Sequence, residues 1–304
     1  NSLVKKACDK GYKKLTDLTK TKFDVITSSE LDNIVPSIKT DTNGSVKPQL
    51  AKSSNDCSLS VHEKLRWASR KLDGVRCLIN FNGSVSRGGG DYDVVTEHIR
   101  AYSGLIKLFE DYPDLILDGE LYVHGWPLQR ISGTCRLKTR EEERCSKIEY
   151  WVYDIVDMNK TFEQRLDFLM FKLPDYIKED APIKIVEHKK VECWNDVKKL
   201  HDKFVAEGFE GLVSRHPDKK YAAGKRSSDW IKVKDYQSDE FEITGIEKGL
   251  RDEDMCFTLK TKLGKPFKAK PVGDRELKQE YLENWPTYVG KMGTVTYFAM
   301  SSDN

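Results

Sequence analysis

The segment from Lys71 to Arg87 carries the side chains best suited to phosphate chemistry. It begins as Lys71-x-Asp73-Gly74-x-Arg76, continues as a strand-like run, and reaches Arg87 after an Asn-Gly pair, which is typical of a two-residue hairpin turn. Such a turn places Arg76 and Arg87 on one face, because side chains alternate along a strand. Guanidinium groups bind phosphate oxygens in bidentate geometry, and Lys71 at the mouth of the hairpin would meet the phosphate that they hold.

The position of the turn predicts a specific strand register. With Asn82-Gly83 as the turn residues, Phe81 pairs with Ser84 and Leu78 pairs with Arg87. For a four-residue pattern taken alone, the alternative is a charged hairpin that only faces water.

Two other segments place carboxylates on strands. The run from Leu115 to Val123 alternates so that Asp118, Glu120 and Tyr122 share one face, and carboxylates on a half-buried strand are costly unless they have partners. Glu210 is a second acidic strand position and could hold a metal ion. The alternative for the first pair is a charged edge strand that keeps the protein soluble.

The run from Trp230 to Lys234 alternates in the same way and directs Lys232 and Lys234 to one face. These two lysines could also be the solvated face of a sheet. The joint occurrence of the hairpin, the carboxylate strands and the lysine strand is much harder to attribute to chance than any one of them.

Together these segments resemble the covalent nucleotidyltransferases and, among them, the ATP-dependent DNA ligases, of the small type found in viruses and phages. The motifs follow the order of that family: Lys71-x-Asp73-Gly74-x-Arg76, Ser86-Arg87-Gly88, Asp118-Gly119-Glu120, Tyr153-Asp154, Glu210-Gly211-Leu212-Val213 and Lys232-Val233-Lys234. The resemblance implies an enzyme that seals 3′-hydroxyl/5′-phosphate nicks in duplex DNA during repair, replication or recombination.

The resemblance also assigns roles to residues. Lys71 would attack the α-phosphate of ATP and carry AMP as a phosphoramidate, with Asp73 and Arg76 completing the catalytic group. A lysine ammonium must lose its proton before it attacks, and Arg76, Lys232, Lys234 and a bound metal ion would favour that loss by charge repulsion.

The remaining assignments concern the nucleotide, the metal and the DNA. Arg76, Lys232 and Lys234 would bind the phosphates, Glu120 the ribose, and Tyr153 would stack on adenine. Mg²⁺ or Mn²⁺ would be held by Glu210 and Glu120. AMP would then pass to the 5′-phosphate of the nick before the 3′-hydroxyl displaces it, and the residues expected to contact DNA are Ser86, Arg87, Lys260, Lys262 and Lys268.

Two departures from the family pattern stand out. Many members carry an acidic or otherwise distinctive residue two positions before the lysine, where this chain has Ser69, so adenine recognition is expected to rest on backbone groups. The last family motif, a basic segment that orients pyrophosphate, has no clear equivalent before Asn304, so the C-terminal domain is expected to be truncated.

The predicted fold class is α+β. Residues 1–50 form a lysine-rich appendage and linker, residues 51–235 an adenylation domain of antiparallel sheets with flanking helices, and residues 236–304 an OB-fold β-barrel. One amphipathic helix is predicted over Thr96 to Asp111, where Ile99, Tyr102, Ile106 and Phe109 form a stripe.

Alternative functions from the same and other classes stay open at this point. An RNA ligase uses the same lysine chemistry. A catalytically silent nick-binding module would be expected to lose Lys71, Glu120 or Lys234, and all three are present.

The composition limits the possible partners and the cellular environment of the protein. With 51 basic and 49 acidic residues among 304, the net charge of +2 predicts no global attraction for a polyanion, so any DNA surface must be local. Seven cysteines form no C-x-x-C pair, which favours reduced thiols in the cytoplasm or nucleus. The apolar runs are too short to cross a bilayer, and we expect a monomer with no membrane role.

Overall fold

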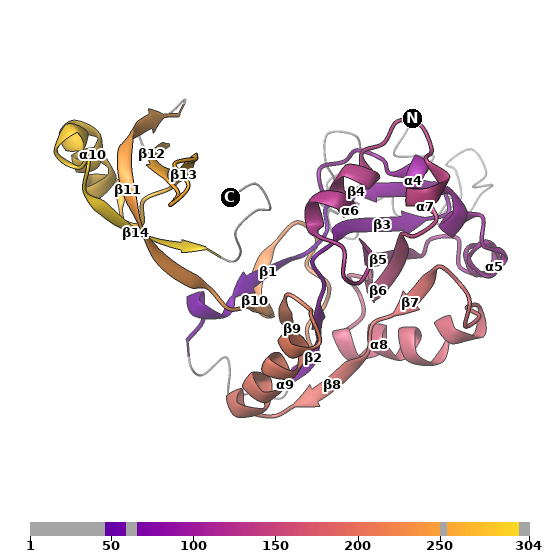
Figure 1. Ribbon diagram of the computed structural model, residues 1–304. Coiled ribbons are helices and arrows are strands. Elements are labelled where there is room, and N and C mark those ends of the chain that lie inside the picture. The colour runs from indigo at the N-terminus through magenta and orange to yellow at the C-terminus, as the bar shows by residue number, and fades with distance from the viewer. Residues whose placement is uncertain (1–45, 59–65, 250–253, 298–304) are drawn as a thin grey trace, which may run out of the picture.

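A computed structural model describes residues 46–58, 66–249 and 254–297 of the chain. Most of the predicted appendage, residues 1–45, lies outside the described residues. The described strands form three sheets, two of which lie together in one body while the third stands apart from them (Figure 1). No helix of the described residues is long and apolar enough to cross a membrane.

The first sheet has five strands in the order β1-β10-β9-β2-β8. The strands are β1 (Leu50–Ser53), β2 (Arg66–Lys71), β8 (His188–Val191), β9 (Gly211–Arg215) and β10 (Arg226–Val233), with the short 3-10 helix η2 (Ser54–Asp56) after β1. Helix α9 (Trp194–Ala206) covers its outer face. Phe204 of this helix packs there with Ala68, Leu212 and Ile231, which are all fully buried.

The second sheet also has five strands, in the order β4-β3-β5-β6-β7. They are β3 (Val75–Asn80), β4 (Gly83–Ser86), β5 (Ile116–Tyr122), β6 (Glu149–Ile155) and β7 (Ile183–Ile185). The associated helices are α4 (Asp93–Arg100), α5 (Ser103–Asp111), α6 (Leu128–Cys135), α7 (Glu142–Cys145), α8 (Phe162–Phe171) and the 3-10 turn η3 (Leu173–Asp175). The predicted sheets with flanking helices are therefore confirmed, but the sheets are mixed, because β1 runs parallel to β10 and β6 parallel to β7.

The predicted hairpin register is wrong by two residues. Leu78 pairs with Val85 and Asn80 with Gly83, so the turn residues are Phe81 and Asn82. The Asn80 side chain fixes this turn, since its Oδ1 accepts hydrogen bonds from the backbone N–H groups of Asn82 (2.9 Å) and Gly83 (3.1 Å). A shift of two preserves the alternation of faces.

The single helix predicted over Thr96 to Asp111 is also wrong. The chain forms α4 and α5, which are separated at Ala101 and Tyr102, and Ile106 of the predicted apolar stripe is 45% exposed. Tyr102 has the extended φ and ψ of an N-cap residue, and Gly104 lets the second helix approach the backbone of Tyr176.

The third sheet has four strands in the order β13-β12-β11-β14. They are β11 (Gln237–Lys248), β12 (Met255–Lys260), β13 (Pro266–Ala269) and β14 (Met292–Tyr297), with α10 (Arg275–Asn284) and η4 (Trp285–Thr287) before the last strand. Its buried cluster is small, comprising Phe241, Ile243 and Leu259. Among residues 237–249 and 254–297 these strands form an open sheet and no closed barrel.

Gly104 provides a test of the packing between α5 and the segment at Tyr176. A Cβ added at Gly104 would overlap the Tyr176 carbonyl oxygen, whereas at Gly133 in α6 the nearest atom is a flexible arginine nitrogen 3.7 Å away. Gly104→Ala should lower the free energy of unfolding by about 3 kcal/mol through overpacking. Gly133→Ala should be neutral or stabilising by up to about 1 kcal/mol, because alanine favours helix. Equal effects of the two variants in urea denaturation would contradict this packing.

Candidate active site

The inner face of the first sheet carries the predicted lysines in ordered rows. Cross-strand partners place Lys71 beside Gly211, and Ser69 beside Val213, which in turn pairs with Lys232. Further along the same strands, Arg215 pairs with Trp67 on β2 and with Trp230 on β10. The register of β10 thus places Lys232 on the predicted face, while Lys234 follows the end of the strand and contacts Glu210.

Lys71, Glu210 and Lys234 are in direct contact. The Lys71 Nζ donates to Glu210 Oε2, and the Lys234 Nζ donates to Glu210 Oε1 at 2.9 Å. The Glu210 side chain is only 5% exposed, and its backbone N–H donates to the Lys71 carbonyl oxygen at 3.0 Å. One buried carboxylate therefore holds two lysines side by side at the end of β2.

Gly211 makes this contact possible. A Cβ at this position would overlap the Val233 carbonyl oxygen and lie 3.2 Å from the Lys234 Cα. The close approach of β9 and β10 brings Glu210 to Lys234, and no residue with a side chain fits between these strands without displacing them.

Other ionisable groups around Lys71 have shifted proton affinities. Burial raises the pKa of Glu120 to about 7, although Lys71 and Arg76 oppose the shift, and the Tyr153 hydroxyl donates to Glu120 at 3.3 Å. Burial and the Glu210 carboxylate raise the pKa of Asp73. Burial and the neighbouring Lys234 and Lys71 ammonium groups lower the pKa of Lys232.

Arg76 lies apart from the exposed hairpin surface that the sequence suggested. Its guanidinium forms a bidentate pair with Asp118, which is fully buried, and also donates to the Gln49 carbonyl oxygen. The Tyr221 hydroxyl donates to the same Asp118 carboxylate at 2.8 Å. Arg76 thus satisfies a buried charge, while Arg87 is exposed on the turn after β4 and forms no ion pair within the described part of the chain.

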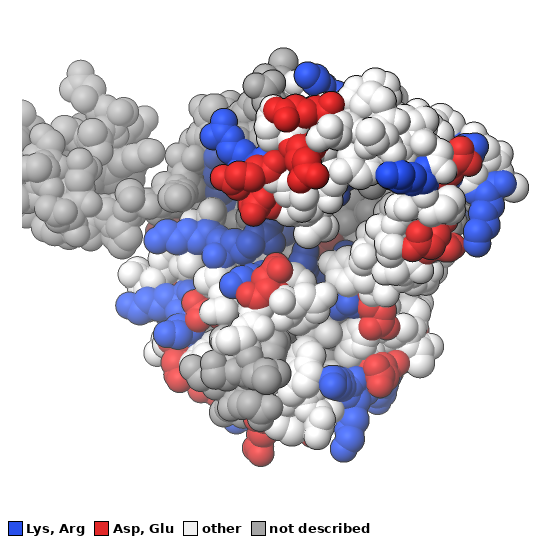
Figure 2. Space-filling view, turned by 90° about the vertical axis from the view of Figure 1, so that its left-hand side faces the viewer, with Lys and Arg blue, Asp and Glu red and all other residues white. Residues whose placement is uncertain are grey.

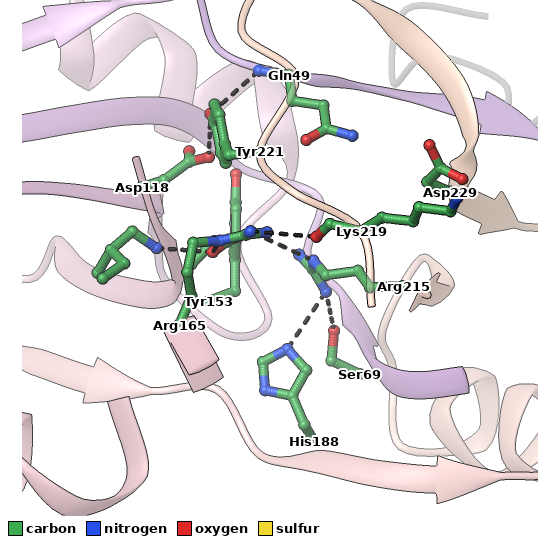
Figure 3. A network of polar contacts seen from close by, with 12 residues as sticks. Gln49, Ser69, Asp118, Tyr153, Arg165, His188, Arg215, Lys219, Tyr221 and Asp229 are labelled. Carbon is green, nitrogen blue, oxygen red and sulfur yellow. Dashed lines mark hydrogen bonds and ion pairs between the residues drawn. The ribbon is translucent and has the colours of Figure 1, made fainter. Parts of the chain in front are cut away.

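A second buried group of charges was not foreseen from the sequence. Arg165 binds both carboxylate oxygens of Asp154, at 2.7 and 3.1 Å, and Arg215 lies 4.0 Å from the same carboxylate. Figure 3 shows Arg215 with Arg165 on one side and Ser69 and His188 on the other. The only local signals were Asp154, directly after Tyr153, and Arg215, two residues after Val213.

The lysines expected to track DNA on the third sheet are each paired with a carboxylate. Lys260 lies 2.7 Å from Glu242, Lys262 lies 3.2 Å from Asp239, and Lys268 lies 2.5 Å from Glu247. Their local field is therefore largely balanced. On the two-sheet body, by contrast, Figure 2 shows a band of basic side chains across the face that looks left in Figure 1.

The candidate metal ligands are Glu210 and Glu120. Within the described ranges no three His, Cys, Asp or Glu side chains are grouped as a ready-made metal site. Mg²⁺ in nucleotide enzymes is commonly bound by one or two carboxylates together with substrate phosphates, and a buried carboxylate such as Glu210 suits that mode.

Comparison with known proteins decides the family. Residues 48–234 match the model of the ATP-dependent DNA ligase domain, which is more than half of the chain. The chain belongs to this family. A DNA ligase 4 from the fungus Coprinopsis cinerea is 32% identical over 183 residues, covering 54% of this chain and 18% of the relative. A DNA ligase of African swine fever virus is 26% identical over 231 residues, covering 70% of this chain and 52% of the relative.

The ligase-family chain spans a fifth or less of the first of these relatives and about half of the second. Among solved structures, one from a study of Lig E DNA ligases superposes with a TM-score of 0.64 at 20% identity, covering 84% of this chain and 94% of that one. At that identity the likeness concerns the fold, which it supports for the sheets and their flanking helices.

The raised pKa of Glu120 predicts a pH dependence of stability. An acid whose pKa is about 7 when folded and 4.5 when unfolded contributes stability that is complete below pH 4.5 and lost as the pH rises to about 7. Between these values the free energy of unfolding should fall by up to about 3 kcal/mol. Glu120→Gln should flatten this slope relative to the wild type, because the raised pKa of Asp73 and the lowered pKa values of His98 and His188 contribute equally in both proteins. Identical slopes for the two proteins in urea titrations would refute the assignment.

Proposed function

We propose that this protein is an ATP-dependent DNA ligase that seals nicks between a 3′-hydroxyl and a 5′-phosphate in duplex DNA. The observation that carries the proposal is the contact of Lys71 and Lys234 with the single buried carboxylate of Glu210. A nucleophilic lysine needs neighbouring cations to bind a triphosphate, and this arrangement supplies them in a chain of the ligase family.

In the first step, the Lys71 nitrogen loses a proton and attacks the α-phosphorus of ATP. A nitrogen–phosphorus bond forms, the bond from that phosphorus to the bridging oxygen breaks, and pyrophosphate leaves. Lys232 lies on β10 and Lys234 directly follows that strand in contact with Glu210, and both would neutralise the phosphate charge. Glu210 holds the attacking nitrogen in place, because its second oxygen is bound by Lys234.

Glu120 and Tyr153 would hold the nucleoside. Their side chains are joined by a hydrogen bond of 3.3 Å, so the tyrosine ring is oriented by the same group that would accept from the ribose hydroxyls. Mg²⁺ would be held by Glu210 and, as the nucleotide binds, by its phosphates, with Glu120 nearby. The ion would neutralise charge on the phosphates.

In the second and third steps, AMP moves to the 5′-phosphate of the nick and is then displaced by the 3′-hydroxyl. Asp73 and Arg87, with Ser86, are the residues that we assign to these steps. Residues 51–235 would act as the adenylation domain, and the third sheet as part of an OB-fold that contacts nicked DNA through Lys260, Lys262 and Lys268. We expect a monomer whose domains rearrange around the duplex.

Self-labelling tests the proposal directly. Wild-type protein incubated with α-labelled ATP and Mg²⁺ should retain label after denaturing electrophoresis, whereas labelled GTP and NAD should leave it unlabelled. Lys71→Ala should reduce labelling by at least about a thousandfold, because the nucleophile is lost. The adenylylated protein should then seal a nicked duplex without further ATP.

Lys189→Ala is the matched control. Lys189 is a lysine on β8 of the same sheet, 39% exposed and paired with Glu187 at 3.4 Å, so its loss should leave labelling unchanged. Label that survives in Lys71→Ala, or a wild-type protein that takes no label from ATP, would overturn the proposal.

A further inference from the structure

Ser69 lies at the inner end of the proposed nucleotide site. It precedes Lys71 by two residues on β2 and therefore shares its face, and it pairs with Val213 on one side and His188 on the other. Ser69 is 1% exposed. Arg215, whose guanidinium donates a hydrogen bond to Ser69, lies 5.2 Å from the centre of the Tyr153 ring. Arg215 thus contacts both Ser69 and the residue expected to stack on the base.

Arg215 fixes the hydrogen-bonding roles around Ser69. Its NH1 group donates to Ser69 Oγ at 3.0 Å and to His188 Nε2 at 3.3 Å (Figure 3). A guanidinium only donates, so both partners must act as acceptors. Arg215 is itself 3% exposed and packs 4.4 Å from the Trp230 ring centre, which leaves it little freedom to turn away.

As a consequence, the Ser69 hydroxyl is left as a hydrogen-bond donor. A hydroxyl that accepts from Arg215 keeps its own proton for donation, and the hydrogen bonds of the described residues include no acceptor for the Ser69 proton. His188, with Nε2 accepting, carries its proton on Nδ1. The Arg215 Nε forms no hydrogen bond within the described residues and lies 4.0 Å from Asp154 Oδ2. Burial and the Arg215 charge lower the pKa of His188 far below its usual range, which keeps its ring neutral.

Buried donors without partners are costly, and a ligand that accepts from one of them gains affinity and specificity. A carboxylate at the position of Ser69 would accept a hydrogen bond from the exocyclic amine of the base, because an ionised carboxylate has no proton to donate. Ser69 held by Arg215 presents the opposite polarity.

We propose that Arg215 is a positioning residue that turns the Ser69 hydroxyl into a hydrogen-bond donor toward the nucleotide, so that the base is selected through a ring-nitrogen acceptor of the purine. This inference rests on the proposed function, since it concerns nucleotide choice in the self-adenylylation step. Arg215 acts through Ser69 and touches no reacting atom.

Deaza analogues of ATP test whether the site donates a hydrogen bond to a ring nitrogen of the base. The 1-deaza, 3-deaza and 7-deaza triphosphates each replace one ring nitrogen by C–H and keep the exocyclic amine. For wild type, one of them should raise the KM of self-adenylylation roughly five- to tenfold, the effect of one lost hydrogen bond, with kcat within about twofold. Ser69→Ala should raise the KM for ATP by the same factor and remove the extra penalty of that analogue.

Arg215→Met should reproduce the KM rise of Ser69→Ala, and the double variant should be no worse than the poorer single one, because both changes remove the same contact. Arg66→Met is the matched control. Like Arg215, Arg66 is a buried arginine that donates to a serine hydroxyl, Ser214 Oγ, at 3.0 Å. Arg66 lies on β2 and faces the opposite side of the sheet from Ser69. It should lose stability without changing the KM for ATP or the analogue pattern.

Wild-type KM values that are equal for ATP and all three analogues would overturn the inference while leaving the self-labelling reaction intact. So would a Ser69→Ala variant with the wild-type KM and analogue pattern. If Arg215→Met does not fold, Ser69→Ala and the analogues still decide the question. A wild-type protein that takes no label from ATP would instead overturn the proposed function, and the inference with it.

Discussion

The pairing of two fully buried carboxylates with guanidinium groups is the constraint on which the two-sheet body depends. Asp118 and Asp154 lie on neighbouring strands of the second sheet, and both are 0% exposed. A buried carboxylate is tolerated only when it is paired and hydrogen-bonded, and removing one partner costs several kcal/mol. Arg215, from the first sheet, approaches Asp154, and Tyr221, from the segment before β10, bonds Asp118. The charges that stabilise the second sheet therefore also hold the first sheet against it.

This constraint explains why Lys71 and Arg76 of the Lys71-x-Asp73-Gly74-x-Arg76 motif have different roles. Lys71 ends β2 in the first sheet, and Arg76 lies on β3 in the second, so the motif spans the joint between the sheets. Gly74 makes the crossing possible, because a Cβ there would lie 2.5 Å from the Leu121 carbonyl oxygen and 2.7 Å from Glu120 Cγ. Arg76 anchors the motif to Asp118, and the lysine is thereby held opposite Glu120.

Local patterns predicted what depends on local geometry. Alternation along a strand was enough to place Lys232 on the inner face of β10 and to put Asp118 and Glu120 on one face of β5. The hairpin register was not predicted, because the Asn80 side chain stabilises a turn one residue earlier than the Asn-Gly pair suggests. The contact of Arg215 with Ser69 was also out of reach, since it joins residues 146 positions apart and depends on strand order. The pairing of Arg76 with Asp118 follows from the same long-range packing.

The two kinds of ion pair in this chain have different physical consequences. Pairs such as Lys260 with Glu242 are exposed, contribute little to stability, and can exchange the carboxylate for another anion at little cost. Those of Asp118 and Asp154 are buried and cannot exchange without loss of packing. Glu210 lies between these extremes, because its carboxylate is buried while Lys71 and Lys234 remain about one fifth exposed. Its pairs are thus strong enough to orient the lysines, and open enough for an incoming phosphate to compete for them.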